Sequence, residues 1–398
     1  MEIRNVAIIA HVDHGKTTLV DALLRQSGAF RENQHVAAQA LDSNELERER
    51  GITILAKCTS ILWHGARINI VDTPGHADFG GEVERILNMV DGAILLVDAS
   101  EGPLPQTKFV VSKALQQGLR PIVAINKIDR PDERHDLVLN EIFDLFVSLG
   151  ASDTQLDFPV LYGSGRGGWM ARSPEGPKRD LTPLFELVLA HVPRPLVEPG
   201  PFRMLATTLE ADPYLGRVLT GRITSGSVRP NQSIKAIDRD GALIESARVT
   251  KVLGFRGLDR APLDVAEAGD IVAIAGITRA SVADTLCDVA IERPLPAQPI
   301  DPPTLAMMFR INDGPFAGQE GSRVQSRVIR DRLLKESERN VAIRVAEQAD
   351  SDSFEVAGRG ELQLGILIET MRREGFELTV SRPRVVMKSD SAGGICTP

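Results

Sequence analysis

The stretch from Ala10 to Thr18, Ala-His-Val-Asp-His-Gly-Lys-Thr-Thr, constrains the fold of this chain more than any other feature. An apolar, β-branched run at Val6–Ile9 precedes it and is typical of a buried parallel strand. After it, apolar residues recur on one helical face as far as Gly28. A strand, a glycine-containing loop and a helix in this order predict a phosphate-binding loop.

Within this loop, each residue type suits a different part of a nucleotide. Gly15 permits a tight turn in which successive N–H groups point at phosphate oxygens. We expect Lys16 to reach the β- and γ-phosphates and Thr17 to bind Mg²⁺. Ala10 departs from the usual pattern, which begins with Gly. The residues predicted to hold the phosphates are Asp13, His14, Gly15, Lys16, Thr17 and Thr18.

Length and composition limit the class of protein. A chain of 398 residues is too long for one ordinary core, so two or three domains are expected. The three cysteines are far apart and predict neither a disulfide framework nor a zinc site. With no signal peptide and no apolar run long enough for a membrane span, we expect a cytoplasmic protein. The net charge of -8 argues against general coating of nucleic acid but is compatible with a local basic face.

Residues 1–197 alternate apolar runs with helical patterns, which predicts a mostly parallel sheet with helices on both faces. Ligands bind where such strands end, at their carboxyl edge. The expected strands include Val6–Ala10, Arg67–Asp72, Gly92–Asp98, Pro121–Asn126 and Pro159–Tyr162.

Two segments suit the sensing of a γ-phosphate. Residues 45–54 form either a solvated charged segment or a mobile one whose Thr53 closes over Mg²⁺. The sequence Asp-Thr-Pro-Gly-His at 72–76 follows a strand, so Asp72 suits Mg²⁺, usually through water. Gly75 suits a backbone N–H that meets the γ-phosphate. His76 is either the residue that orients the attacking water or a surface turn histidine.

The sequence Asn-Lys-Ile-Asp at 126–129 predicts a guanine site. A carboxylate only accepts hydrogen bonds, so Asp129 suits the two donors on guanine, which adenine lacks in that arrangement. Asn126 suits the other edge of the base, and the stem of Lys127 can cover its face. Ser164, after the last expected strand, lies in a loop that can supply donors to the base oxygen. An ATP-driven enzyme is therefore disfavoured.

Two proline clusters separate further domains. Residues 198–297 carry short alternating runs and turn signals, best seen at Asp240-Gly241, and predict a β-barrel. Residues 302–384 predict a ferredoxin-like domain of strand–helix–strand–strand–helix–strand order. Its first helix, expected at 322–337, would carry Arg323, Arg327 and Arg330 on one face, either solvated or facing RNA phosphate. Residues 385–398 are expected to be a flexible tail.

Several longer segments resemble one family. They are Phe79-Gly-Gly-Glu-Val-Glu-Arg, Asp98-Ala-Ser-Glu-Gly-Pro-Leu-Pro-Gln-Thr, Gly358-Arg-Gly-Glu-Leu and Gly365-Ile-Leu-Ile-Glu-Thr-Met-Arg-Arg-Glu-Gly-Phe-Glu-Leu. With the nucleotide motifs, they resemble the TypA/BipA family of ribosome-binding translational GTPases. The resemblance runs to about Pro383. Gln363 departs from it, because related sequences commonly have His there.

The resemblance implies a GTPase that hydrolyses GTP to GDP and phosphate with Mg²⁺, as a ribosome-associated translational or stress-response factor. It implies that Val12 and Ile52 form an apolar gate that keeps His76 away until the ribosome opens it. The expected partner of this monomer is the ribosome, through its RNA and proteins. The family continues with further domains, so we expect a truncated chain with weakened ribosome binding. Two alternatives remain: a non-catalytic GTP-dependent switch, and a translocation factor like LepA or elongation factor G.

Overall fold

The chain forms two compact units in the computed structural model, which describes residues 1–28, 45–257, 259–297, 301–340, 342–348, 352–389 and 395–396. The first unit comprises residues 1–76 and 83–297. The second comprises residues 77–82 and 298–398. The sequence also predicts a strand around Val341–Val345, whose first residue, Val341, lies outside the described residues.

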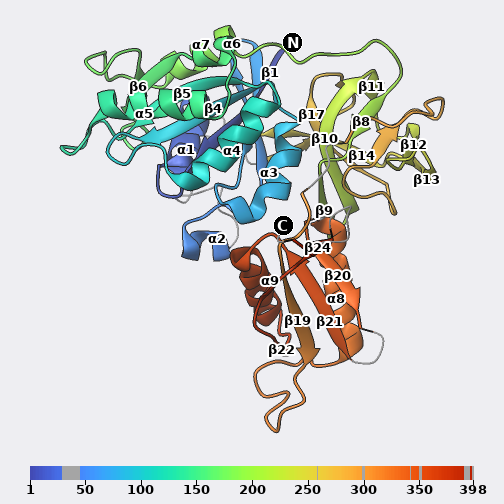
Figure 1. Ribbon diagram of the computed structural model, residues 1–398. Helices are drawn as coiled ribbons and strands as arrows, with labels where there is room; N and C mark the ends of the chain where they lie inside the picture. The colour runs from blue at the N-terminus through green and yellow to red at the C-terminus, as the bar shows by residue number, and fades with distance from the viewer. Residues whose placement is uncertain are drawn as a thin grey trace. The chain divides into compact units, whose positions relative to one another are not determined.

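A seven-stranded sheet with the order β2-β3-β1-β4-β5-β6-β7 forms the first half of the first unit (Figure 1). The five central strands are parallel, and the two edge strands pair antiparallel, so the mostly parallel sheet is confirmed. The strands are β1 (Glu2–Ala10), β2 (Lys57–Trp63), β3 (Ala66–Asp72), β4 (Gly92–Asp98), β5 (Arg120–Asn126), β6 (Val160–Ser164) and β7 (Trp169–Ala171).

Helices cover both faces of this sheet, as the hydrophobic core shows. Successive residues of β1 belong to different buried clusters: Ile8 packs in one and Ile9 in the other. Helices α1 and α7 contribute to the first cluster, and α3, α4 and α5 contribute to the second. The helices are α1 (Lys16–Gln26), α2 (Glu45–Arg50), α3 (Gly80–Leu87), α4 (Pro105–Gln116), α5 (His135–Ser148), α6 (Asp153–Leu156) and α7 (Thr182–His191).

The second half of the first unit is an antiparallel β-domain. The tight turn predicted at Asp240-Gly241 joins β12 to β13, with Gly241 at a φ of 87°. Nine strands form one sheet, and β11 (Ser227–Val228) pairs with β16 (Ala266–Glu267). The nine are β8 (Arg203–Leu205), β9 (Thr208–Asp212), β10 (Gly216–Ser225), β12 (Ser233–Ile237), β13 (Leu243–Arg248), β14 (Lys251–Arg256), β15 (Asp259–Pro262), β17 (Ile271–Ala275) and β18 (Thr285–Cys287).

Buried and partly buried polar side chains join this β-domain to the parallel sheet within the first unit. Arg222 of β10 forms an ion pair with Asp91 at 2.7 Å. The amide of Asn5 donates to the Gly269 carbonyl at 3.0 Å, and that of Asn69 donates to Asp270 at 3.1 Å. Because Asn5 and Asn69 are buried, these partners satisfy polar groups that water does not reach.

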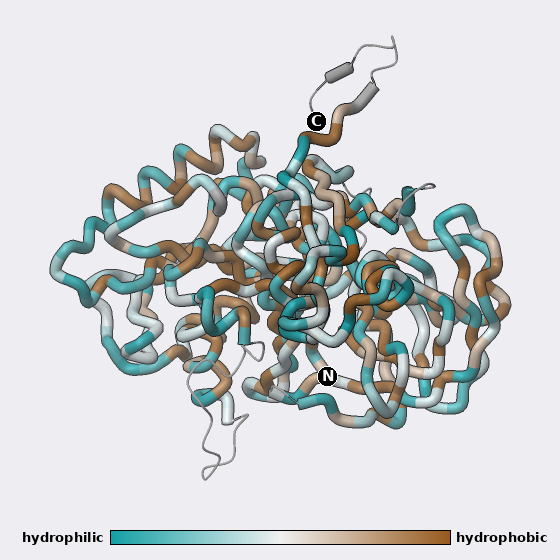
Figure 2. Tube along the Cα trace, turned by 90° about the horizontal axis from the view of Figure 1, so that it is seen from below, coloured by the Kyte–Doolittle hydropathy of each residue, from teal (hydrophilic) through white to brown (hydrophobic). Residues whose placement is uncertain are grey.

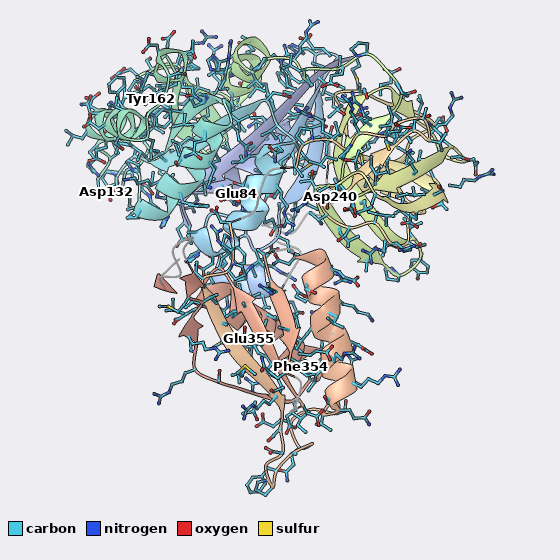
Figure 3. All side chains as sticks on the ribbon, turned by 45° about the vertical axis from the view of Figure 1, so that its right-hand side comes forward. Glu84, Asp132, Tyr162, Asp240, Phe354 and Glu355 are labelled. Carbon is cyan, nitrogen blue, oxygen red and sulfur yellow. The ribbon has the colours of Figure 1, made fainter. Side chains whose placement is uncertain are left out.

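The second unit has the ferredoxin-like order β19, α8, β20, β21, α9, β22, with an antiparallel sheet in the order β20-β21-β19-β22. Successive residues of β21 face opposite ways: Phe354 is buried in the core, and Glu355 accepts a hydrogen bond from Arg384 (Figure 3). The elements are η1 (Ala77–Phe79), β19 (Leu305–Ile311), α8 (Ser326–Arg339), β20 (Arg344–Glu347), β21 (Ser353–Gly358), α9 (Glu361–Arg373), β22 (Leu378–Val380) and β23 (Arg384–Val385), then the pair β24 (Lys388–Ser389) and β25 (Ile395–Cys396).

Two predicted boundaries differ from the structure. Helix α8 begins at Ser326, so Arg323 lies outside it and does not share a helical face with Arg327 and Arg330. The cause is strand-like pairing, because the Arg323 N–H donates to the Gly375 carbonyl and the Glu377 N–H donates to the Arg323 carbonyl. Val385, which we assigned to the tail, pairs with Leu305 in β23.

Apolar residues are spread along the chain in short stretches (Figure 2). Among the described residues, no helix is both long and apolar enough to cross a membrane.

Candidate functional site

The predicted phosphate-binding loop joins β1 to α1 at the carboxyl edge of the parallel sheet. Gly15 is the N-cap of α1 and has a φ of 93°, a conformation that other residues rarely adopt. A Cβ atom at Gly15 would lie 2.6 Å from the Asn126 amide nitrogen. Glycine is therefore required by both the backbone conformation and the space. The N-terminus of α1 follows directly, which favours the binding of an anion.

Lys16 connects this loop to the end of β3. Its Nζ lies 2.8 Å from Asp72 Oδ1 and also donates to the Thr73 carbonyl. The Thr53 hydroxyl faces the other oxygen of Asp72, at 3.4 Å. Three residues that the sequence placed near Mg²⁺ and phosphate thus converge, although 19 positions separate Thr53 from Asp72.

The donor set at this point suits Mg²⁺. No group of three or more His, Cys, Asp or Glu residues that could hold a metal occurs among the described residues. Mg²⁺ needs no such group, because it is usually bound by one or two carboxylates together with substrate phosphates and waters. The Asp72 carboxylate beside the Thr53 hydroxyl, with Thr17 in the first turn of α1, fits that pattern.

Gly75 lies against the end of β1. A Cβ atom there would lie 2.7 Å from the Ala10 carbonyl oxygen, so a side chain is excluded. The next residue, His76, is partly buried. Burial lowers the pKa of nearby His11, and the charge of His76 acts in the same direction. The predicted water-orienting residue therefore lies near a second histidine that sequence reasoning did not assign.

The Asn126 side chain ties three loops together. Its amide nitrogen donates to the His14 carbonyl at 2.8 Å, and its oxygen accepts from the Gly165 N–H at 2.8 Å. Lys127 donates to the Asp13 carbonyl at 2.6 Å. Both side chains therefore position the phosphate-binding loop, and their contact with the base stays a prediction.

Asp98, at the end of β4, is a buried residue of the site that sequence reasoning did not assign. Burial alone would raise its pKa, but hydrogen bonds from Lys127 and Ser100 lower the pKa to about 2. The Asp98 N–H also donates to His14 Nδ1 at 3.3 Å, which leaves His14 Nε2 facing Glu101 at 3.3 Å. The available signal was positional, because Asp98 ends a parallel strand just as Asp72 does.

The remaining base-site residues lie beyond the ends of β5 and β6. Asp129 is exposed, so its carboxylate is accessible to a ligand. Ser164 is buried, and its hydroxyl accepts from the Gly167 N–H at 3.0 Å, which shapes the loop after β6. The phosphate, metal and base candidates other than Thr53, which lies between α2 and β2, therefore follow the ends of β1, β3, β5 and β6, all on one edge of one sheet.

Comparison with known proteins agrees with this architecture. The family model of the elongation factor Tu GTP binding domain matches residues 1–194, and that of elongation factor Tu domain 2 matches residues 216–287. A solved structure from Thermus thermophilus matches with a TM-score of 0.73 and 20% sequence identity. The match covers 97% of this chain and 68% of the Thermus chain. The family models place the chain among the translational GTPases, and the solved structure shows the same fold.

Sequence relatives identify the family more closely. The large ribosomal subunit assembly factor BipA of Escherichia coli K12 is 55% identical to this chain over 97% of the chain's length. The protein of the same name from a Synechocystis strain is 55% identical over 100% of this chain. The chain belongs to the BipA family. It spans 64% and 66% of the length of those two relatives.

Proposed function

We propose that this chain binds GTP and GDP and hydrolyses GTP to GDP and phosphate with Mg²⁺. The convergence of Lys16, Thr53 and Asp72 at the phosphate-binding loop carries this proposal. A cation, a hydroxyl and a carboxylate at one helix N-terminus suit a Mg²⁺-bound triphosphate. The chain's contribution is positioning and electrostatic stabilisation, since phosphoryl transfer needs little covalent chemistry from a protein.

The phosphates would lie along Asp13–Thr18. Thr17 and Thr53 would hold Mg²⁺ directly and Asp72 through water, with the metal offsetting charge on the β- and γ-oxygens. To do so, Lys16 exchanges Asp72 for phosphate oxygen, which leaves the carboxylate for the metal shell. Gly75 would donate its N–H to the γ-phosphate, where no side chain blocks the approach.

Specificity for guanine would rest on Asp129. Its exposed carboxylate is suited to the ring N–H and exocyclic amine of guanine. Asn126 would bind the other edge of the base, and the stem of Lys127 would cover its face. Their hydrogen bonds to the carbonyls of His14 and Asp13 would also hold the base site at a set distance from the phosphate site. Loss of either would disturb both ends of the nucleotide.

His76 would orient the attacking water, with Val12 and Ile52 as the apolar gate that holds it away until a partner acts. We propose ribosomal particles as that partner, contacted through RNA and protein, and action as a monomer in the cytoplasm. Support comes from the relatives, whose name specifies assembly of the large ribosomal subunit. A stress-response role belongs to the same proposal.

Calorimetry on wild type and Asp129→Asn tests the nucleotide site. We expect micromolar binding of GDP and of a non-hydrolysable GTP analogue, no comparable binding of ATP, and loss of guanine binding in the variant. Asp132→Asn is the matched control, because that exposed carboxylate lies outside the motif and should change nothing. Equal ATP binding by wild type would contradict the proposal.

A further inference from the structure

The connection between β19 and α8 extends beyond the end of the sheet in the second unit (Figure 1). Its backbone is organised around one carboxylate. Glu377 accepts hydrogen bonds from the N–H groups of Gly318, Glu320 and Gly321, at 3.0 to 3.1 Å, and from the Asn312 side chain at 2.5 Å. The Asn312 oxygen in turn accepts from the Gly314 N–H at 3.1 Å.

Local geometry leaves this loop little freedom. Gly318 has a φ of 83°, which favours glycine. A Cβ atom at Gly321 would lie 2.7 Å from the Gly375 carbonyl oxygen. The Glu377 carboxylate is held ionised, since the Asn312 hydrogen bond, followed by the backbone N–H groups, lowers its pKa. The loop is therefore fixed before any partner arrives.

The fixed loop displays one large apolar side chain. Phe316 is 71% exposed, and its neighbours in sequence are Pro315 and Ala317. Arg310 is the last residue but one of β19 and precedes the loop. Arg323 follows the loop, just before α8. Both side chains are exposed. Arg323 is held in place over the Phe376 ring, at 5.1 Å.

We propose that Phe316 stacks on an unpaired base of RNA, with Arg310 and Arg323 beside it near the backbone phosphates. An exposed aromatic ring on a loop with exposed arginines at its two ends is typical of surfaces that bind single-stranded RNA. The inference rests on the proposed ribosomal partner and specifies where RNA would be contacted.

The surroundings of Phe316 favour a base over a protein pocket. Protein interfaces need a contiguous apolar patch, whereas one ring face suffices for stacking. Here the flanking residues Pro315 and Ala317 are small, and Phe316 is the only large apolar residue between Ile311 and Val324 in the sequence. The exposed acids Asp313 and Glu320 offset the two arginines, so stacking supplies most of this contact and depends little on salt.

Binding of labelled chain to isolated large ribosomal subunits, with a non-hydrolysable GTP analogue, tests the proposal. We expect Phe316→Ala to weaken binding about 5- to 150-fold, the range for losing one stacked base. Phe316→Trp should bind like wild type, and Phe316→Leu should bind like Phe316→Ala. The weakening should persist as salt is raised, and also appear with protein-free ribosomal RNA. Val328→Ala, an exposed apolar residue of α8 in the same unit, is the control.

A second pair of variants tests whether the Glu377 contacts position the ring. Glu377→Gln places an amide group against N–H donors and should release the loop, so adding Phe316→Ala to it should cost little further affinity. All three single Phe316 variants should unfold like wild type, because the ring is exposed.

Three other binding results would each contradict a different part of the proposal. Wild-type affinity in Phe316→Leu would indicate that residue 316 contacts an apolar protein pocket and not a base, and would overturn the inference. Wild-type affinity in Phe316→Ala would remove the loop from the contact while leaving the proposed function intact. If wild type itself does not bind the subunits or their RNA, the ribosomal partner and this inference fail together, and the nucleotide site stands on its calorimetry.

Discussion

Lys16 Nζ and Asp72 Oδ1 form a buried ion pair at 2.8 Å, between the phosphate-binding loop and the end of β3. The Lys16 side chain is 9% exposed and that of Asp72 is 2% exposed. At this depth each charge depends on the other for compensation. The same two groups are those that the proposed Mg²⁺-bound nucleotide would contact, so its binding would exchange one set of charge contacts for another.

Lys16→Ala should therefore change stability as well as nucleotide affinity. It leaves the Asp72 carboxylate buried without its cation, which typically costs about 3–5 kcal/mol. Urea unfolding without nucleotide measures this loss. Adding Asp72→Asn should restore part of the stability, because the uncompensated charge is removed, but should not restore nucleotide affinity. Equal stability of wild type and Lys16→Ala would show that Lys16 does not compensate the buried charge of Asp72.

His76→Ala should leave nucleotide affinity nearly unchanged and lower the rate of GTP hydrolysis by about 10²-fold or more. This is the rate loss usual when a side chain that positions or transfers a proton is removed. Phosphate release, with and without ribosomes, measures the rate. His64→Ala is the matched control, because His64 is exposed in the turn between β2 and β3. Lost affinity in His76→Ala would instead assign that residue a structural role.

Much of the site was predictable because its residues follow parallel strands, whose carboxyl ends meet at one edge. The loop before α1 and Asp72 needed only that rule. The bridging roles of Asn126 and Lys127 were not predictable, since they depend on the distance between loops far apart in sequence. Asp98 was missed for the same reason: its partner Lys127 lies on the neighbouring strand's loop.

The fold was predictable where local pattern and tertiary contacts agree. Strand Gly92–Asp98 was predicted with its observed bounds, because its buried apolar run ends at a charged residue. The start of α8 was not predicted correctly, because residues 322–325 carry no helix-breaking signal. Pairing of Arg323 with the chain at Gly375 and Glu377 holds that segment extended, and such a contact is invisible in the local sequence.

Stability should fall in acid through Asp98. Its folded pKa of about 2 lies below the ordinary value of 3.8, so its stabilising contribution is present above about pH 4 and is lost as the pH falls towards 2. Asp98→Asn should be less stable than wild type at neutral pH, and the difference should narrow in that window. Denaturant unfolding at several pH values measures it. Asp129→Asn, which alters an exposed carboxylate, should follow wild type throughout.

The start of α9 offers a pair of glycine substitutions with opposite expected signs. Within the second unit, Asp78 Oδ2 accepts from the Leu362 N–H at 2.8 Å, and a Cβ atom at Gly360 would overlap the Asp78 carboxylate. Gly360→Ala must displace that carboxylate and should cost about 1 kcal/mol, the usual value of a lost helix cap. Gly365→Ala, inside the same helix with open space around it, should stabilise by about 0.5–1 kcal/mol.

Thermal unfolding of the two variants, and of Asp78→Ala, measures these effects. Gly360→Ala combined with Asp78→Ala should cost less than the sum of the two single changes, because both remove the same contact. Additive costs would mean that Asp78 does not cap α9. Destabilisation by Gly365→Ala would show that open space around a glycine of this helix does not ensure a gain, and the cost of Gly360→Ala would then not be assigned to the cap alone.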